Sequence, residues 1–306
     1  MKISVIGAGN VGGLTAMRLA EAGLGEVLLC DVVKGLAAGK AGDMLDSQAA
    51  LKCRFNIDGS DDISRIEDSQ IIIVTAGLAR RPGMTREELL QKNAQIVKEV
   101  ALQIKDKAPQ AIVVVVTNPL DLMTFLVIKT SGLSPKRVFG MGLNLDTSRF
   151  ANLISRQLNI PATEINAMVI GAHGEGMLPL VRLSQAKGIA LEELLDEEKL
   201  KALTVATVKR GAEIVSLLGS GSAYFAPSAA LLEVVKAIAG DQKRTLGLSV
   251  YLNGEYGLKD ICIGVPCLLG KNGIEKIIEL DLNSQEKEAF LKTADSIKAH
   301  LNQLKV

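Results

Sequence analysis

The first half of the chain alternates short apolar runs with longer segments in which apolar residues recur at helical spacing. The runs are nearly continuous and rich in β-branched residues, which is typical of strands buried in a parallel sheet. They occupy residues 3–6, 27–30, 71–74 and 112–116, and the clearest helical pattern covers residues 85–104. Strands that alternate with helices predict an α/β fold with a doubly wound parallel sheet. Ligands of such sheets bind beyond the carboxyl ends of the strands.

The second half mixes helices with strands of another kind. Residues 138–142 are expected to form the last strand of the parallel sheet, so we place a boundary between domains 1–143 and 144–306. An Asn283 cap, with Glu286 three residues later, begins a final amphipathic helix. The other expected elements are a strand at 165–170, antiparallel strands at 248–252 and 261–269, and helices at 143–158, 178–186, 191–218 and 227–239.

Composition excludes several classes of protein. The 306 residues are 48% hydrophobic and carry a formal net charge of +1, so they can bury a large core and show no basic surplus for nucleic acid. No apolar run reaches membrane-spanning length, and the chain begins directly with a strand, so we expect no membrane anchor and no signal or transit peptide. The four cysteines lack zinc-ligand spacing, which favours reduced thiols in a cytoplasmic protein.

A glycine-rich turn joins the first strand to the first helix. Its sequence is Gly7-Ala8-Gly9-Asn10-Val11-Gly12, and the order strand, GxGxxG, helix is the fingerprint of a dinucleotide-binding unit. Gly7 permits the tight turn, Gly9 lets the main chain approach a pyrophosphate, and Gly12 lets helix and strand pack closely. Asp31 ends the second strand at about the expected 20 residues further on. A carboxylate there binds ribose hydroxyls and repels a 2′-phosphate, which favours NAD over NADP; a plain glycine turn with a capping aspartate is the alternative.

One of the two histidines, His173, lies in the sequence Gly171-Ala172-His173-Gly174-Glu175-Gly176 after an expected strand. The unperturbed pKa of histidine lies near neutrality, so this side chain suits reversible proton transfer, and the glycines leave room for a ligand. It could instead be a structural loop residue, or a metal ligand beside Glu175, although no third ligand lies nearby. His300 falls on the last helix and is expected at the surface.

Charged residues at two further places can bind an anion. The loop after residue 77 carries Arg80, Arg81 and Arg86 around a Pro-Gly break. Its position above the carboxyl edge of the sheet predicts a hinged lid that carries cations, rather than a merely solvated basic loop. Asp146 and Arg149 are three residues apart on an expected helix and share one face, where they could orient an imidazole and hold a carboxylate or form only a surface ion pair.

Together these motifs resemble the lactate/malate dehydrogenase family. The motifs that match in order and spacing are the glycine-rich turn, Asp31, the arginine-rich loop, Thr117-Asn118-Pro119, Asp146-x-x-Arg149 and Gly171-Ala172-His173-Gly174. The resemblance covers almost the whole chain. It implies an NAD-dependent 2-hydroxy acid dehydrogenase with a Rossmann domain and a mixed α/β substrate domain. It also implies a homodimer or homotetramer that acts on a small molecule.

The resemblance assigns a role to each matching residue. His173 exchanges the proton of the substrate hydroxyl, and Asp146 holds its ring. Arg149 binds the C1 carboxylate and Arg86 polarises the carbonyl group. Asn118 hydrogen-bonds the substrate oxygen. The implied cofactor contacts are the glycine-rich turn, Asp31, Asn93, Val116, Thr117 and Asn118.

Arg80 occupies the family position that selects the substrate, where lactate enzymes carry glutamine and malate enzymes carry arginine. The distal carboxylate of oxaloacetate would pair with a buried Arg80, whereas pyruvate would leave this cation unpaired. Ala223, at a facing position, leaves room for it. The resemblance therefore implies oxidation of (S)-malate to oxaloacetate, although Arg81 could point inward in place of Arg80. The alternatives are a lactate or broad 2-hydroxy acid dehydrogenase and a non-catalytic nucleotide-binding protein of the same fold.

Overall fold

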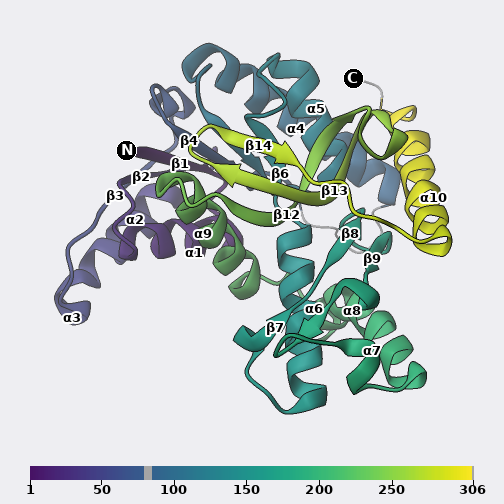
Figure 1. Cartoon of the computed structure of the whole chain (residues 1–306). Helices are drawn as coiled ribbons and strands as arrows, with labels where there is room; N and C mark the ends of the chain where they lie inside the picture. The colour runs from purple at the N-terminus through teal and green to yellow at the C-terminus, as the bar shows by residue number, and fades with distance from the viewer. Residues whose placement is uncertain (79–84, 305–306) are drawn as a thin grey trace.

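The computed structural model describes residues 1–78 and 85–304, and only the main chain of residue 86. In this part of the chain the main sheet has 11 strands, and β14 (Gly273–Ile277) pairs with β13 beside the main path. The order along the path is β3 (Asn56–Ser60), β2 (Glu26–Cys30), β1 (Lys2–Ile6), β4 (Ile71–Val74), β5 (Ile112–Val115), β6 (Val138–Gly140), β12 (Arg244–Asn253), β13 (Lys259–Gly270), β8 (Val169–Gly171) and β9 (Met177–Pro179). Figure 1 shows that helices cover both faces of this sheet. The chain thus combines one large sheet with flanking helices, as an α/β fold requires.

The predicted doubly wound parallel sheet is confirmed. Its parallel strands are β1 (Lys2–Ile6), β2 (Glu26–Cys30), β3 (Asn56–Ser60), β4 (Ile71–Val74), β5 (Ile112–Val115) and β6 (Val138–Gly140). The continuous apolar runs of β4 and β5 are buried throughout, because helices pack on both of their faces. β3 was not expected, because the sequence Asn56-Ile57-Asp58-Gly59-Ser60 has no apolar run.

Helices connect the parallel strands and cover the sheet. They are α1 (Asn10–Glu21), α2 (Leu36–Asp46), α3 (Gln48–Leu51), α4 (Arg86–Lys107), α5 (Leu120–Ser131) and, from the second half, α9 (Phe225–Ala239). In Figure 1, α1, α2 and α9 lie on one side of the sheet, and α4 and α5 on the other. α9 packs against α1, and Arg18 of α1 donates a hydrogen bond from Nε to Ser228 Oγ of α9 at 2.9 Å. The second half of the chain therefore helps to cover the parallel sheet.

The sequence predicted that residues 138–142 form the last strand of the sheet. β6 is the last parallel strand, but the sheet continues beyond it. Ser249 of β12 pairs with Gly140 of β6 in antiparallel fashion and so extends the sheet into the second half of the chain. The strands that follow are β12 (Arg244–Asn253), β13 (Lys259–Gly270), β14 (Gly273–Ile277), β8 (Val169–Gly171) and β9 (Met177–Pro179). The expected antiparallel pair at 248–252 and 261–269 is confirmed as β12 and β13.

A separate lobe lies below the sheet in Figure 1 and contains α6 (Leu143–Leu158), α7 (Leu191–Leu194) and α8 (Glu197–Leu218). Phe150 and Ile154 of α6 and Leu203 of α8 belong to a second apolar core in this lobe. A small sheet of β7 (Ile165–Asn166), β10 (Gln185–Ala186) and β11 (Ile189–Ala190) completes it. α6 spans the predicted residues 143–158 and leads from the sheet into the lobe.

Three predictions of secondary structure in the second half of the chain were wrong. The strand at 165–170 is broken at residues 167–168, because β7 pairs with β10 in the small sheet whereas β8 pairs with β13 and β9. The helix at 178–186 does not form: Pro179, which has no N–H to donate, lies in β9, and a 3₁₀ turn and β10 follow. The helix at 191–218 is two helices, because Asp196 accepts a hydrogen bond from the Lys199 N–H at 2.9 Å and starts α8 afresh.

The final helix, α10 (Ser284–Leu301), begins as predicted. Asn283 accepts a hydrogen bond from the Glu286 N–H, and the Glu286 side chain accepts one from the Asn283 N–H, each at 2.9 Å. This capping box satisfies two amide groups at the start of the helix. Among the described residues, no helix is long and apolar enough to cross a membrane.

Candidate active site

The motif residues gather at one edge of the parallel sheet. Gly7 follows β1, Asp31 follows β2, Gly77 lies just beyond β4, and Asn118 lies just beyond β5. Parallel strands bring their carboxyl ends to the same edge. These residues therefore share one edge of the sheet, the edge at which the sequence predicts a ligand.

The glycine-rich turn has the shape that a pyrophosphate needs. Gly7 has a φ of 106°, and a Cβ at Gly12 would lie 1.8 Å from the carbonyl oxygen of Gly7, so neither position accepts a side chain. A Cβ at Gly9 would meet nothing within 4 Å, which leaves open space before the helix. Gly9 is the N-cap of α1, and no side chain caps this helix. The free amide groups and the positive end of the helix dipole suit a dinucleotide phosphate.

Asp31 and Lys40 bind the main-chain N–H and the main-chain carbonyl oxygen of Ala8 in this turn. Asp31 Oδ2 accepts a hydrogen bond from the Ala8 N–H at 2.6 Å, and its Oδ1 accepts one from the Val33 N–H at 2.9 Å. Lys40 of α2 donates from Nζ to the Ala8 carbonyl oxygen at 2.7 Å. Asp31 is only partly buried, and its carboxylate oxygens have further lone pairs beside these two hydrogen bonds. Its contact with an adenosine ribose stays a prediction.

Two buried side chains join the loops after β4 and β5. Asn93 of α4, 1% exposed, accepts a hydrogen bond from the Leu78 N–H at 2.8 Å and donates one to the Asn118 carbonyl oxygen at 2.8 Å. Thr117 donates from Oγ1 to the Ala76 carbonyl oxygen at 2.6 Å. These bonds fix the loops, while the Asn118 side chain itself is exposed at the edge. Direct contacts of Asn93, Val116 and Thr117 with the cofactor stay predictions.

The structure brings His173, Asp146 and Arg149 together. His173 Nδ1 lies 2.7 Å from Asp146 Oδ2, and Arg149 Nη1 donates to Asp146 Oδ1 at 3.1 Å. Asp146 is fully buried, so its charge is little screened by solvent. Gly142, the N-cap of α6, makes room for the ring, because a Cβ there would lie 2.9 Å from His173 Cγ. One carboxylate thus orients an imidazole and a guanidinium side by side.

The imidazole of His173 is readily protonated. Burial of the ring opposes its charging and lowers the pKa, but the charge and hydrogen bond of Asp146, together with the charge of Asp121, more than offset this, so that the pKa is raised. Asp146 holds Nδ1, and among the described residues none bonds Nε2, which leaves this second nitrogen for a ligand. This arrangement suits a group that exchanges a proton near neutral pH.

Sequence reasoning missed Asp121, which lies in the first turn of α5. Its Oδ2 accepts a hydrogen bond from the His173 main-chain N–H at 3.1 Å, and its Oδ1 accepts one from Ser249 Oγ at 2.6 Å. Burial raises the pKa of Asp121 to about 6, although the Ser249 hydrogen bond and the charge of His173 lower it. A carboxylate after the conspicuous Asn118-Pro119 motif was the only available signal.

Arg149 has unused capacity to bind an anion. Its Nε is buried and has no hydrogen-bond partner among the described residues. A buried unpaired donor costs about 1–3 kcal/mol, so an arriving carboxylate would relieve this penalty. A Cβ at Gly211 of α8 would lie 3.3 Å from Arg149 Nη1, so this glycine preserves the space beside the guanidinium.

The side chains of the arginines that the sequence predicted to form a lid cannot be placed from the described residues. Arg80 and Arg81 fall outside the described residues. Arg86 is the first residue of α4, where Thr85 and Glu88 form a capping box, but its side chain is outside the description. Ala223 lies between α8 and α9 and is partly buried.

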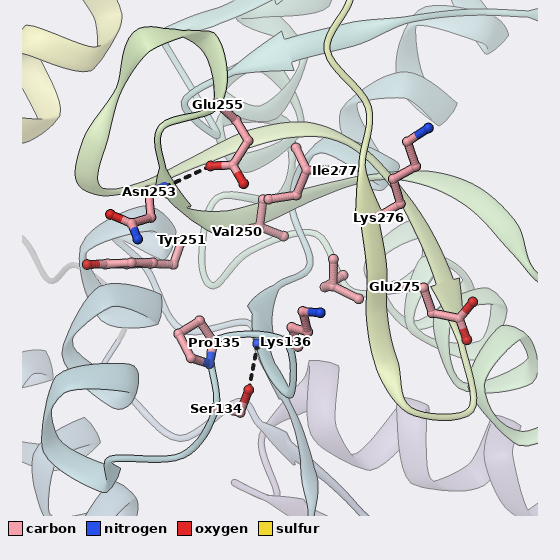
Figure 2. Close-up of a pocket in the computed structure, with 11 residues that line it drawn as sticks. Ser134, Pro135, Lys136, Val250, Tyr251, Asn253, Glu255, Glu275, Lys276 and Ile277 are labelled. Carbon is pink, nitrogen blue, oxygen red and sulfur yellow. Dashed lines mark hydrogen bonds between the residues drawn. The ribbon is translucent and has the colours of Figure 1, made fainter.

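A surface hollow elsewhere contains none of these residues. Figure 2 shows it between the turn at Ser134, Pro135 and Lys136, the end of β12 and strand β14. Its charged lining residues balance, with Lys136 and Lys276 against Glu255 and Glu275. It therefore offers no excess charge for an ionic ligand. Within the described part of the chain, no cluster of three acidic, histidine or cysteine side chains could hold a metal ion.

Comparison with known proteins agrees with the geometry. The lactate/malate dehydrogenase NAD-binding domain matches residues 1–140, and the α/β C-terminal domain of that family matches residues 144–306. A malate dehydrogenase of Methanosarcina acetivorans is 47% identical over 303 residues, which are 99% of each chain. The apo malate dehydrogenase of Picrophilus torridus superposes with a TM-score of 0.95 at 41% identity, covering 98% of this chain and 96% of that one. The lactate dehydrogenase of Cryptosporidium parvum, complexed with lactic acid and NAD, has a TM-score of 0.94 at 35% identity and 98% coverage of both chains.

The fold and this site define an NAD-dependent oxidoreductase with a Rossmann domain. The chain belongs to the lactate/malate dehydrogenase family. The family, fold class and cofactor inferred from the sequence are confirmed. NAD also fits the residues present, because Gly7, Gly9 and Gly12 form an open turn at an uncapped helix and the carboxylate of Asp31 bonds this turn.

Proposed function

We propose that this chain is a malate dehydrogenase, which reversibly oxidises (S)-malate to oxaloacetate with NAD. The observation that supports this most directly is the shared carboxylate of Asp146. It places a proton-exchanging imidazole beside a carboxylate-binding guanidinium, and a 2-hydroxy acid presents a hydroxyl and a carboxylate on adjacent carbons. The relatives with the highest identities here are named malate dehydrogenases.

The protein side chains act on the proton and on the substrate's charges. In the oxidation, neutral His173 accepts the hydroxyl proton at Nε2, and Asp146 stabilises the imidazolium that results. In the reduction, protonated His173 returns this proton to the oxygen. Arg149 holds the C1 carboxylate bidentately. Arg86 and Asn118 are proposed to bind the substrate oxygen, which becomes negative as the carbonyl is reduced.

The cofactor is held by the edge of the parallel sheet. When bound, NAD accepts the hydride from C2 in the oxidation and returns it in the reduction. The amide groups at residues 10–12 are proposed to bind its pyrophosphate, and Asp31 its adenosine ribose. Asn93 and Thr117 keep the loops after β4 and β5 at fixed positions beside it.

Arg80 is the residue we expect to choose between malate and lactate. Oxaloacetate has a second carboxylate that pyruvate lacks. A charge-assisted hydrogen bond contributes about 1.5–3 kcal/mol, and a charged donor that is buried without a partner costs more. At about 1.4 kcal/mol per tenfold, a preference of roughly a hundredfold is expected. Solved lactate dehydrogenases with similar folds, at 35% identity, make lactate the nearest alternative substrate.

A paired substrate assay tests this proposal. NADH oxidation is measured with oxaloacetate and with pyruvate, for the wild type and for Arg80→Gln and Arg81→Gln. We expect the wild type to prefer oxaloacetate by about a hundredfold in kcat/KM. Arg80→Gln should lose most of this preference, and Arg81→Gln is the matched control on the same loop. A wild type that prefers pyruvate would establish the lactate alternative instead.

A non-catalytic nucleotide-binding protein is the alternative from another class. The retained constellation of His173, Asp146 and Arg149 argues against it, because nucleotide binding alone requires none of these side chains. His173→Ala should abolish turnover while NADH still binds, as followed by its fluorescence. Equal turnover in this variant would show that another group transfers the proton.

We further propose that the chain is a homodimer or a homotetramer in the cytoplasm. Large apolar side chains at the ends of α8 and α9, Leu217 and Phe225, are 79% and 64% exposed, which favours their burial by another subunit. All four cysteines are unpaired, as expected in a reducing compartment. Residues 1–143 and 144–306 are proposed as the two domains.

A further inference from the structure

A second buried carboxylate, that of Asp121, bonds the main chain of His173. Asp121 is 5% exposed and comes from α5, whereas Asp146 comes from α6. Asp146 bonds the ring of His173, but Asp121 bonds its main-chain N–H at 3.1 Å. Ser249 of β12, itself fully buried, donates to the other oxygen of Asp121 at 2.6 Å. Asp121 therefore links three segments: the start of α5, the strand β12 and the loop that carries His173.

We propose that Asp121 is a positioning residue for His173, a carboxylate that fixes the main chain of the histidine and electrostatically favours the protonated imidazole. This inference rests on the proposed function, because it concerns the residue to which proton transfer is assigned. Neither the sequence motifs nor the proton-transfer roles given above include Asp121.

The charges around the histidine support this role. Asp121 interacts with His173 from the loop after β8, with Asp146 from α6 and with the thiol of Cys262 from β13. His173 in turn interacts with Asp146, Asp121 and Arg149. Among the described residues, the two carboxylates and the guanidinium around His173 leave one negative charge in excess, which a protonated imidazole neutralises. With Asp146 as the sole carboxylate, Arg149 would already neutralise it, and the imidazole would gain less from its proton.

The effect of Asp121 on His173 is largest before a substrate binds. The carboxylate of a 2-oxo acid is expected to pair with Arg149, whose buried Nε has no partner among the described residues, and it then adds a negative charge of its own beside the imidazole. Burial raises the pKa of Asp121 to about 6, so the group is charged at and above neutral pH. Asp121 thus supplies its charge in the range where His173 must keep a proton for the reduction.

The chain permits a direct measurement of this effect. It contains only two histidines, so the protein labelled with ¹³C at histidine Cε1 gives two NMR signals, which a His300→Gln variant assigns. His300 is exposed on α10 and bonds the Ser296 carbonyl oxygen, so it serves as an internal control. The titration needs neither cofactor nor substrate. The proposed activity can therefore fail in the paired substrate assay while this coupling holds, and the reverse is equally detectable.

Asp121→Asn is the decisive variant. An asparagine can turn its oxygen to the His173 N–H and its amide group to Ser249, so that both hydrogen bonds persist while the charge is lost. We expect the pKa of His173 to fall by about one unit and that of His300 to stay unchanged. Oxaloacetate reduction, which needs protonated His173, should then lose activity at lower pH than in the wild type. Malate oxidation, which needs neutral His173, should extend to lower pH.

Ser249→Ala provides an independent test. It can be made even if Asp121→Asn does not fold. The Ser249 hydrogen bond lowers the pKa of Asp121, so its loss leaves Asp121 protonated over a wider range. The pKa of His173 should therefore fall, as in Asp121→Asn, but by a smaller amount. An unchanged His173 titration in a folded variant, with lower activity at every pH, would overturn the electrostatic role and leave Asp121 a purely structural residue.

Discussion

Gly211 of α8 lies against the guanidinium of Arg149, and a Cβ added at residue 211 would lie 3.3 Å from Nη1. Glycine within a helix is less favourable than alanine by about 0.5–1 kcal/mol, because it loses more conformational freedom on folding. A helix that retains glycine here gives up some stability. In return, the guanidinium can remain where it meets both Asp146 and a substrate carboxylate.

Gly211→Ala should therefore separate stability from substrate binding. We expect the melting temperature to stay the same or rise, and kcat/KM for oxaloacetate to fall on the order of tenfold, because a displaced clamp misorients the substrate. NADH affinity should not change. Gly39→Ala in α2 is the matched control, since a Cβ there meets nothing within 4 Å. The spatial argument fails if both variants keep the wild-type kcat/KM for oxaloacetate.

Asp146→Asn should disable proton transfer while preserving the shape of the site. The carboxylate accepts from both His173 and Arg149, whereas an amide has one oxygen and would present its N–H groups to one of them. The imidazole would lose its orientation and the stabilisation of its charged form. Loss of the equivalent aspartate in a Ser-His-Asp triad lowers kcat by about 10⁴, so we expect a fall of roughly 10²–10⁴.

Steady-state kinetics and NADH titration by fluorescence measure this effect. Cofactor affinity should remain within about twofold, because Asp146 lies on α6 and not in the glycine-rich turn. A variant that keeps more than a tenth of the wild-type kcat would show that Asp146 is not required to orient the imidazole.

The sequence predicted well those features that local physics controls. Continuous β-branched runs such as β4 and β5 could only be buried strands, and parallel strands necessarily bring Gly7, Asp31 and Asn118 to one edge. The capping box at Asn283 is likewise a local hydrogen-bond pattern.

Features that depend on distant partners were missed. The apolar run at 165–170 gives no sign that it divides between two sheets, since the division depends on partners outside the run, in β10 (Gln185–Ala186) and in the distant β13 (Lys259–Gly270). Asp121 looked like an ordinary first-turn aspartate, because its partners His173 and Ser249 are 52 and 128 residues away. The side chains of the arginine-rich loop lie outside the described structure, so their roles stay proposals.

Asn283→Ala should lower stability without affecting catalysis. The variant loses the side-chain half of the capping box of α10, whose residues Phe290, Ala294 and Ile297 are buried in the main core. Loss of such a cap costs about 0.5–2 kcal/mol, which corresponds to a decrease of a few degrees in melting temperature, about 2–4 °C per kcal/mol. Calorimetry gives the melting temperature, and kcat and KM for oxaloacetate should stay at their wild-type values. An unchanged melting temperature would mean that this helix end frays without consequence.

Asp31 should set the preference for NAD over NADP, and two variants separate its two contributions. Its charge opposes a 2′-phosphate, while its oxygens also support the turn by accepting from the Ala8 and Val33 N–H groups. Asp31→Asn removes the charge but keeps one acceptor, whereas Asp31→Ser removes the charge and shortens the side chain. If charge repulsion dominates, both variants should lower the preference for NADH, measured as kcat/KM with NADH divided by kcat/KM with NADPH, by about tenfold or more. A tenfold change corresponds to only about 1.4 kcal/mol of repulsion. Asp31→Ser alone should also weaken NADH binding, because the turn loses its support. A wild-type cofactor ratio in both variants would mean that the carboxylate does not face the ribose and serves the turn alone.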